Sequence, residues 1–133
     1  MFDIKIIKLA SNTKNYGLTN SSTHAASSKN KLCGDKITVE LNVDKIKIKS
    51  MRYETESCIY CQASASVLSN IISSLKINRL KSDFVQIEDY FLTKDKKLPK
   101  KYKLFKNLMK KKNKDRHQCI MLPLYAVQKA LKI

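Results

Sequence analysis

The clearest pattern in the chain is an alternation of apolar and polar residues in its second quarter. Apolar side chains occupy every second position from Ile37 to Val43, and Ile46 and Ile48 resume the alternation after a short polar break. A period of two is typical of a strand with one buried face. The segment therefore predicts two antiparallel strands that are joined by a tight turn near Asp44 and covered on one face.

Helical spacing begins directly after this strand pair. Ser57 is a residue type favoured at the N-cap, so we expect Cys58 at the first helical position and Cys61 one turn later on the same side. The apolar residues that follow at steps of three and four are Ala63, Val67, Leu68, Ile71, Ile72 and Leu75. This stripe predicts one helix with a single buried face. The small residues 63–66 would let neighbouring elements approach closely.

Three more helices are expected in the second half of the chain. Residues 83–92 predict a short helix, and a second follows Pro99 with the run of lysines at 110–114 as its solvated end. The apolar face of this second helix comprises Leu98, Tyr102, Phe105, Leu108 and Met109. A last helix is predicted over 118–131, where Pro123 leaves the carbonyl of Cys119 without its helical N–H partner.

The first thirty residues give weaker signals. Residues 2–10 fit a strand or a short helix, and residues 11–31 are polar and rich in turn formers, with room for one short strand. His24 would lie on this edge strand as a surface residue. Strands first and helices afterwards indicate an α+β fold, a small three-stranded antiparallel sheet packed on one face by several α-helices. A length of 133 residues predicts a single domain over 1–133.

Charge and hydropathy limit the classes of protein to which the chain can belong. The net charge of +16 invites a nucleic-acid interpretation, but the chain has 24 lysines and only three arginines, which suits A/T-rich codon usage better than a surface that reads bases. No apolar run approaches the roughly 20 residues that span a bilayer, and the charged N-terminus does not resemble a signal peptide. We therefore expect a cytoplasmic protein with reduced thiols and no membrane partner.

Reduced thiols make the four cysteines candidates for metal or sulfur chemistry. Cys33 precedes the first clear strand in "LCGDKI", with Asp35 two residues on, while Cys58 and Cys119 lie at the starts of predicted helices. Because helix N-termini lower thiol pKa values, Cys58 and Cys119 are expected to favour the thiolate. Three thiolates and a carboxylate could hold zinc or iron in a tetrahedral site. From spacing alone, buried unreactive cysteines and a Cys58/Cys61 redox dithiol remain alternatives.

Three separated motifs extend this interpretation. The segments "LCGDKITVELNVD", "ESCIYCQASASVLSN" and "RHQCIMLPLYAV" resemble, in order, the iron–sulfur cluster assembly scaffolds of the NifU-like, IscU-like and SufU-like family. The resemblance covers nearly the whole chain and implies that Cys33, Asp35, Cys58 and Cys119 are the metal or cluster ligands. It also implies a transient 2Fe–2S cluster or Zn²⁺ as cargo, a cysteine desulfurase as sulfur donor and iron–sulfur acceptor proteins as partners. Asp35 would keep the cluster labile.

The chain departs from the family pattern near two of these cysteines. The IscU-like branch has a His directly before the third Cys, where this chain has Gln118 with His117 one position earlier. The long segment 76–118 resembles the SufU-like branch, which binds zinc and accepts persulfide sulfur, with Cys33 and Cys119 both candidate acceptors. Cys61 is not part of the family pattern. Cys61, His117 and Arg116 are therefore kept as auxiliary candidates.

The resulting hypothesis is a scaffold rather than an enzyme, although a zinc-dependent sulfurtransferase role fits the SufU-like branch. The sequence contains no Ser-His-Asp constellation and no phosphate-binding loop. Two alternatives come from other classes of protein. A Lys-rich nucleic-acid-binding domain would bind with steep salt dependence and need no metal. A thiol oxidoreductase would use Cys58 and Cys61.

Overall fold

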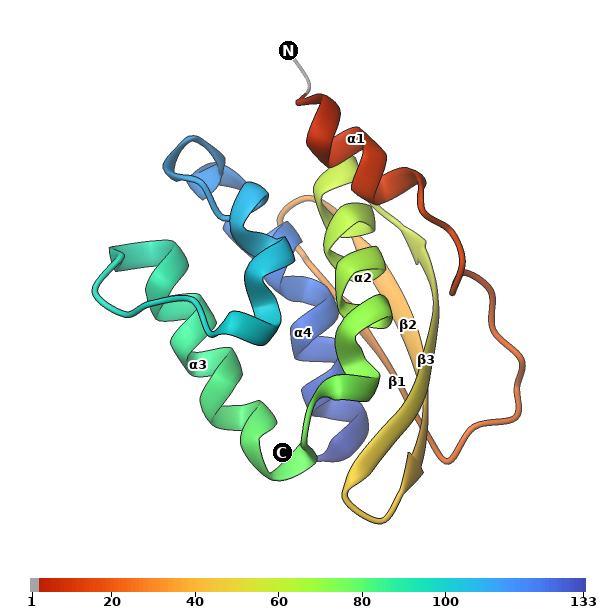
Figure 1. Cartoon of the computed structure of the whole chain (residues 1–133). Coiled ribbons are helices and arrows are strands. Elements are labelled where there is room, and N and C mark those ends of the chain that lie inside the picture. The colour runs from red at the N-terminus through yellow and green to blue at the C-terminus, as the bar shows by residue number, and fades with distance from the viewer. Residues whose placement is uncertain (1–2) are drawn as a thin grey trace.

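The computed structural model describes residues 3–133, and its elements follow the expected order of strands and then helices, except that one helix, α1, comes before the sheet (Figure 1). The helices and strands in chain order are α1 Ile4–Ser11, β1 His24–Lys29, β2 Lys36–Asp44, β3 Lys47–Glu56, α2 Ile59–Ile71, α3 Ile77–Thr93 and α4 His117–Leu131. Three 3₁₀ helices complete the list: η1 Ile72–Ser74, η2 Lys100–Asn107 and η3 Lys111–Arg116.

The three strands form one antiparallel sheet in the order β1-β2-β3. The hairpin turns between Asp44 and Lys47, where Lys45 adopts a left-handed φ of 59°, so the tight turn near Asp44 is confirmed. Ile46 differs from the prediction because it lies in this turn and is 57% exposed, whereas Ile48 is fully buried. The alternation of apolar residues therefore predicts the strands correctly but not the residues of the turn between them.

Helices cover one face of the sheet, as predicted (Figure 1). Ile37, Val39 and Leu41 of β2 are fully buried toward this layer. Ser64 of α2 donates a 2.6 Å hydrogen bond to the carbonyl of Ile120 in α4, so the small residues of α2 do permit the expected close approach. None of the helices within residues 3–133 is long and apolar enough to cross a membrane.

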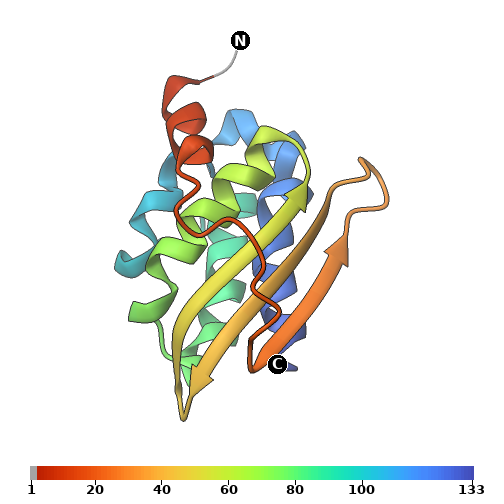
Figure 2. The ribbon, with the colours of Figure 1, turned by 90° about the vertical axis from the view of Figure 1, so that its right-hand side faces the viewer.

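The other face of the sheet is crossed by the segment between α1 and β1 (Figure 2). Tyr16 makes a parallel bridge to Tyr53 of β3, and Glu40 of β2 accepts hydrogen bonds from the backbone N–H groups of Thr19 and Asn20 at 2.7 and 2.8 Å. The ambiguous N-terminal pattern is a helix, α1, while Phe2 lies outside the described residues. This segment buries the Glu40 carboxylate on the polar face.

The helices of the second half differ from the predictions in their bounds. α3 begins at Ile77, six residues before the predicted start, because the N–H of Ile77 bonds the carbonyl of Ile46 and no side chain caps the helix. The helix predicted after Pro99 is a 3₁₀ helix. Its buried residues Tyr102 and Phe105 and the buried C-cap residue Leu108 recur every third position, which matches three residues per turn.

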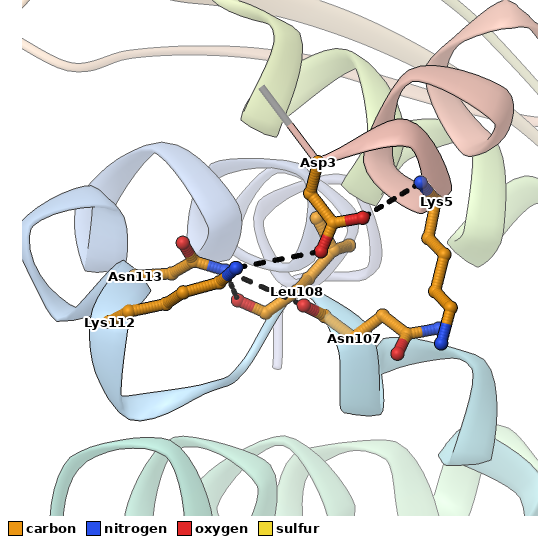
Figure 3. Close-up of polar contacts among 6 residues, drawn as sticks. All are labelled: Asp3, Lys5, Asn107, Leu108, Lys112 and Asn113. Carbon is orange, nitrogen blue, oxygen red and sulfur yellow. Dashed lines mark hydrogen bonds and ion pairs between the residues drawn. The ribbon is translucent and has the colours of Figure 1, made fainter. Parts of the chain in front are cut away.

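The lysines at 111, 112 and 114 are exposed, as predicted, but they do not end the helix after Pro99, because η2 ends at Asn107 and the separate helix η3 begins at Lys111. Asn113 is buried and donates a 2.9 Å hydrogen bond to the carbonyl of Leu108, while Lys112 pairs with Asp3 at 3.7 Å (Figure 3). Asp3 also caps α1 by accepting from the backbone N–H of Lys5. The segment before α4 is therefore held against the core and against the start of α1. These contacts restrain the residues that lead into Cys119.

Candidate metal centre

A tight turn before β2 displays Cys33 and Asp35. The N–H of Gly34 donates to the carbonyl of Asn30, and the N–H of Asn30 donates to the carbonyl of Asp35, both at 2.8 Å. Gly34 has a φ of +76°, a conformation that L-residues with a Cβ rarely adopt. The side chain of Cys33 is exposed, whereas Asp35 is buried and only 5% exposed. The two side chains therefore lie in different environments.

Asp35 caps the helix that carries the second cysteine. Its Oδ1 accepts from the backbone N–H of Cys58 at 3.1 Å, and its Oδ2 lies 3.4 Å from the Cys58 Sγ. Cys58 is itself the N-cap residue with extended backbone angles, so the prediction of Ser57 as N-cap is wrong. The cap comes from a residue 23 positions earlier, which local sequence cannot reveal. The carboxylate therefore ties the β2 turn to the start of α2.

The third cysteine comes from the opposite end of the chain. The Sγ atoms of Cys33 and Cys119 lie 3.5 Å apart, and ligand atoms of Cys33, Asp35 and Cys119 all lie within 4.8 Å of one another. A zinc–sulfur bond of about 2.3 Å places two tetrahedral thiolates about 3.8 Å apart. The Cys33–Cys119 separation is close to that spacing, and the contact between Asp35 and Cys58 extends the same group. Folding thus brings Cys33, Asp35 and Cys119 into one group, and Cys58 lies outside that group but contacts it through Asp35.

The protonation of Cys119 differs from the prediction. Burial raises the pKa of the Cys119 thiol, and hydrogen bonds with Asp35 and Cys33 raise it further. The dipole at the N-terminus of α4 contributes at most about 1–2 kcal/mol and does not offset these effects. The expectation that Cys119 favours the thiolate is therefore wrong for the metal-free protein. A cation bound between the thiols would reverse the balance, because metal binding releases thiol protons.

Cys61 is not part of the cluster that Cys33, Asp35 and Cys119 form within the described residues. It is fully buried, its Sγ lies 3.9 Å from the hydroxyl oxygen of Thr55, and burial raises the pKa of its thiol to about 12. The side chain differs in direction from Cys58 because Cys58 is extended at the N-cap, outside the helix, whereas Cys61 is within its first turn. A protonated, inaccessible thiol is a poor redox partner, which weighs against a Cys58/Cys61 dithiol.

His117 and Arg116 make contacts away from the four donors. His117 Nε2 lies 2.8 Å from Glu88 Oε2, and Gln118 Nε2 lies 3.3 Å from His117 Nδ1. The guanidinium carbon of Arg116 lies 5.4 Å from the ring centroid of Tyr60. Tyr60 is two residues after Cys58. Both auxiliary candidates thus already have protein partners. His24 is on the edge strand, beside the hydroxyl of Thr23 at 2.9 Å.

Sequence reasoning did not identify Glu88 or Tyr125 as relevant to this region. Tyr125 donates a short hydrogen bond to the Glu88 carboxylate that also contacts His117. Glu88 is 29 residues before His117, and nothing in their spacing predicts that α3 and α4 meet at this point. The one available signal is the position of Glu88 on the predicted helix 83–92.

Three thiols and a capping carboxylate, held by a turn and two helix starts, form a candidate metal site that is distributed along the chain and partly exposed. This class differs from a local zinc ribbon, whose ligands come in two closely spaced pairs. The chain matches the family described as the NifU-like N terminal domain over residues 1–133 and belongs to it.

Relatives of known name and structure agree with this family. The chain is 30% identical over 80 residues to the iron-sulfur cluster assembly scaffold protein IscU of Thermotoga maritima, a match that spans 60% of this chain and 56% of that protein. Its fold is similar to a crystal structure of a nitrogen-fixing NifU-like protein (N-terminal) from Brucella abortus, with a TM-score of 0.86, 22% identity and coverage of 98% and 91%.

A second solved structure shares the fold. It is a putative iron-sulfur cluster assembly scaffold protein for the SUF system from Fervidobacterium islandicum AW-1, with a TM-score of 0.85, 23% identity and coverage of 98% of this chain and 96% of that one. The predicted SufU/IscU-like fold with a three-stranded antiparallel sheet is confirmed.

Proposed function

We propose that residues 1–133 form one scaffold domain for iron–sulfur cluster assembly. Cys33, Asp35, Cys58 and Cys119 would bind iron, or zinc in the SufU-like variant, and the domain would accept sulfur from a cysteine desulfurase before passing its cargo to acceptor proteins. The observation that carries the proposal is the convergence of four donor residues from three distant parts of the chain. Four free thiols and the absence of a membrane-spanning helix in residues 3–133 suit the cytoplasm.

The donor set suits cargo that must leave again. Asp35 would be a weaker ligand for iron than a fourth thiolate, since it is a hard oxygen donor and its Oδ1 already accepts from the Cys58 N–H. The exposed Cys33 leaves one side of the site open to a protein partner. An iron–sulfur cluster or metal held in this way could be exchanged, which a closed four-cysteine structural site resists.

Exposure favours Cys33 over Cys119 as the first sulfur acceptor. Cys33 is open to solvent, while Cys119 is 4% exposed. The Cys33 thiolate would attack the outer sulfur of the desulfurase persulfide, which forms a persulfide on Cys33 and releases the desulfurase thiolate. The exchange transfers one sulfur atom with no net oxidation. Such a transfer makes the domain a sulfur acceptor rather than an enzyme with its own substrate turnover.

Anaerobic reconstitution with iron, a cysteine desulfurase and free cysteine tests the proposal. Visible absorption and bound metal should be lost in single Ser variants of Cys33, Cys58 and Cys119 and retained in Cys61→Ser. An equal loss in Cys61→Ser would contradict the ligand assignment. A wild-type protein that binds neither iron nor zinc would contradict the function itself, and steeply salt-dependent nucleic-acid binding without metal would favour the alternative class.

A further inference from the structure

The turn of α4 that carries Cys119 lacks three of the usual sources of helix stability. Arg116 is the N-cap residue, but no side chain caps the helix and its first turn contains no acidic residue. Pro123 lies inside α4 and cannot donate a hydrogen bond to the carbonyl of Cys119, four residues earlier. The backbone around this cysteine is therefore poorly held by its own helix.

Glu88 of α3 supplies a restraint from outside, in addition to the hydrogen bond that Ser64 of α2 donates to the carbonyl of Ile120. Its Oε2 lies 2.8 Å from Nε2 of His117 and also accepts from the hydroxyl of Tyr125, so one carboxylate oxygen holds two residues of α4 on either side of Cys119. The ring of Phe91, one turn after Glu88, packs against the His117 ring with centroids 5.6 Å apart. Together these contacts fasten the first half of α4 to α3.

The hydrogen-bond roles in this cluster are consistent with one another. His117 Nε2 can donate to Glu88, and the side-chain amide of Gln118 lies beside Nδ1, so both ring nitrogens have a hydrogen-bond partner. Burial and the neighbouring Glu88 carboxylate raise the pKa of Tyr125, so the phenol remains a donor. Side-chain exposures of 14% for His117 and 31% for Glu88 leave the pair partly shielded from water.

We propose that Glu88 is a positioning residue for the metal centre and sets the place of the Cys119 sulfur through His117 and Tyr125. The proposal rests on the proposed function for its metal, but its geometric part concerns Cys119 alone. Hydrogen-bonded groups behind a metal ligand commonly change metal affinity by about 10–100-fold when they are removed. Glu88 acts on Cys119 through His117 and Tyr125, so we expect a loss of metal affinity at the lower end of that range.

The chain offers a matched control on the same helix. Asp83, five residues before Glu88 on α3, accepts a 3.2 Å hydrogen bond from the hydroxyl of Tyr102, which belongs to η2 and not to α4. Glu88→Ala and Asp83→Ala each remove one carboxylate that accepts from a tyrosine. Only the first removes a contact to the helix of Cys119.

The test has two readouts on purified protein. In the first, Zn²⁺ affinity is measured by chelator competition and the absorption spectrum of the Co²⁺-loaded protein is recorded. Glu88→Ala should weaken Zn²⁺ binding about tenfold and change the Co²⁺ spectrum, while Asp83→Ala leaves both as in wild type. Glu88→Gln keeps an acceptor oxygen for one donor and should fall between wild type and Glu88→Ala.

The second readout needs no metal. Iodoacetamide labelling of the metal-free protein, mapped by mass spectrometry, should modify Cys119 about tenfold faster in Glu88→Ala, because the loss of hydrogen bonds to a charged group favours local opening of α4. Cys61 serves as an internal reference. Labelling of Cys119 that is unchanged in Glu88→Ala, or raised equally in Asp83→Ala, would overturn the proposal. A wild-type protein that binds no metal would contradict the proposed function, and the labelling would still decide the role of Glu88.

Discussion

The carboxylate of Asp35 has two roles at the scale of single residues, and they can be separated. One is geometric, since Asp35 caps α2 through the N–H of Cys58, and the other is its proposed part in holding the metal. Asparagine is as good a cap acceptor as aspartate but carries no charge. The pair of substitutions Asp35→Asn and Asp35→Ala therefore distinguishes the cap from the ligand.

Both Asp35 variants should bind Zn²⁺ more weakly than wild type, because each removes the anionic donor. Only Asp35→Ala should also lose stability, by about 1 kcal/mol, since it removes the cap acceptor. Urea unfolding of the metal-free proteins and chelator competition measure the two effects. Equal unfolding free energies for all three proteins would show that the contact to Cys58 contributes nothing to folding.

The sequence gives the position of Cys61 along the chain but not the environment of its side chain. The sequence places a second thiol three residues after Cys58, and the structure directs it into the core beside Thr55. We expect Cys61→Ala to cost about 1 kcal/mol of unfolding free energy through the small cavity it creates, with Zn²⁺ affinity unchanged. A drop in Zn²⁺ affinity comparable to that of Cys58→Ser would contradict the placement of Cys61 outside the metal centre.

At the scale of elements, the segment between α1 and β1 depends on one buried carboxylate. Glu40 is 6% exposed and accepts from two backbone N–H groups and from the hydroxyl of Thr19. The Thr19 N–H, more than any other contact, lowers the pKa of Glu40 below its usual value. The carboxylate thus fastens this irregular segment to the outer face of β2.

A lowered pKa in the folded state means that Glu40 stabilises the protein above its unfolded pKa of about 4.3 and ceases to do so as the pH falls through the folded value. Glu40→Gln should therefore be less stable than wild type at pH 7, with the difference shrinking below about pH 4. Thermal unfolding from pH 7 to pH 3 measures this. Glu54→Gln, at an exposed position of β3, is the control, and an equal effect there would contradict the role of Glu40.

The elements also show where sequence patterns succeed. The β2–β3 hairpin was predicted correctly because alternation and turn chemistry are local properties of consecutive residues. The start of α3 was missed because the hydrogen bond from Ile77 to Ile46 replaces a side-chain cap. Spacing of three at Tyr102, Phe105 and Leu108 was visible in the sequence, yet it was interpreted as an α-helix rather than a 3₁₀ helix.

At the scale of the whole molecule, positive charge is concentrated and largely unpaired. Of the 24 lysines, 11 lie within residues 94–116, where only two acidic residues are present. Among the described residues, just two lysines form ion pairs, Lys49 with Asp44 and Lys112 with Asp3. Repulsion between like charges opposes the compact state and is screened by salt.

Sodium chloride should therefore stabilise the fold. We expect the urea midpoint to rise between about 20 mM and 500 mM NaCl, where the screening length falls from roughly 20 Å to 4 Å. The double variant Lys103→Glu/Lys106→Glu, at two exposed positions of η2, should be more stable than wild type at low salt and less sensitive to it. A midpoint that does not change with salt would show that the lysines do not repel one another appreciably.

By itself, the sequence determined that helices follow the hairpin, the apolar face of the hairpin and the three motifs that place the chain among the NifU-like domains. These are properties of neighbouring residues, because side-chain period and motif spacing are written along the chain. The tertiary structure decided which residues meet: Asp35 with the start of α2, Cys33 with Cys119, and Glu88 with His117. Such contacts depend on how helices pack across the sheet, and packing is set by the whole core rather than by any local pattern.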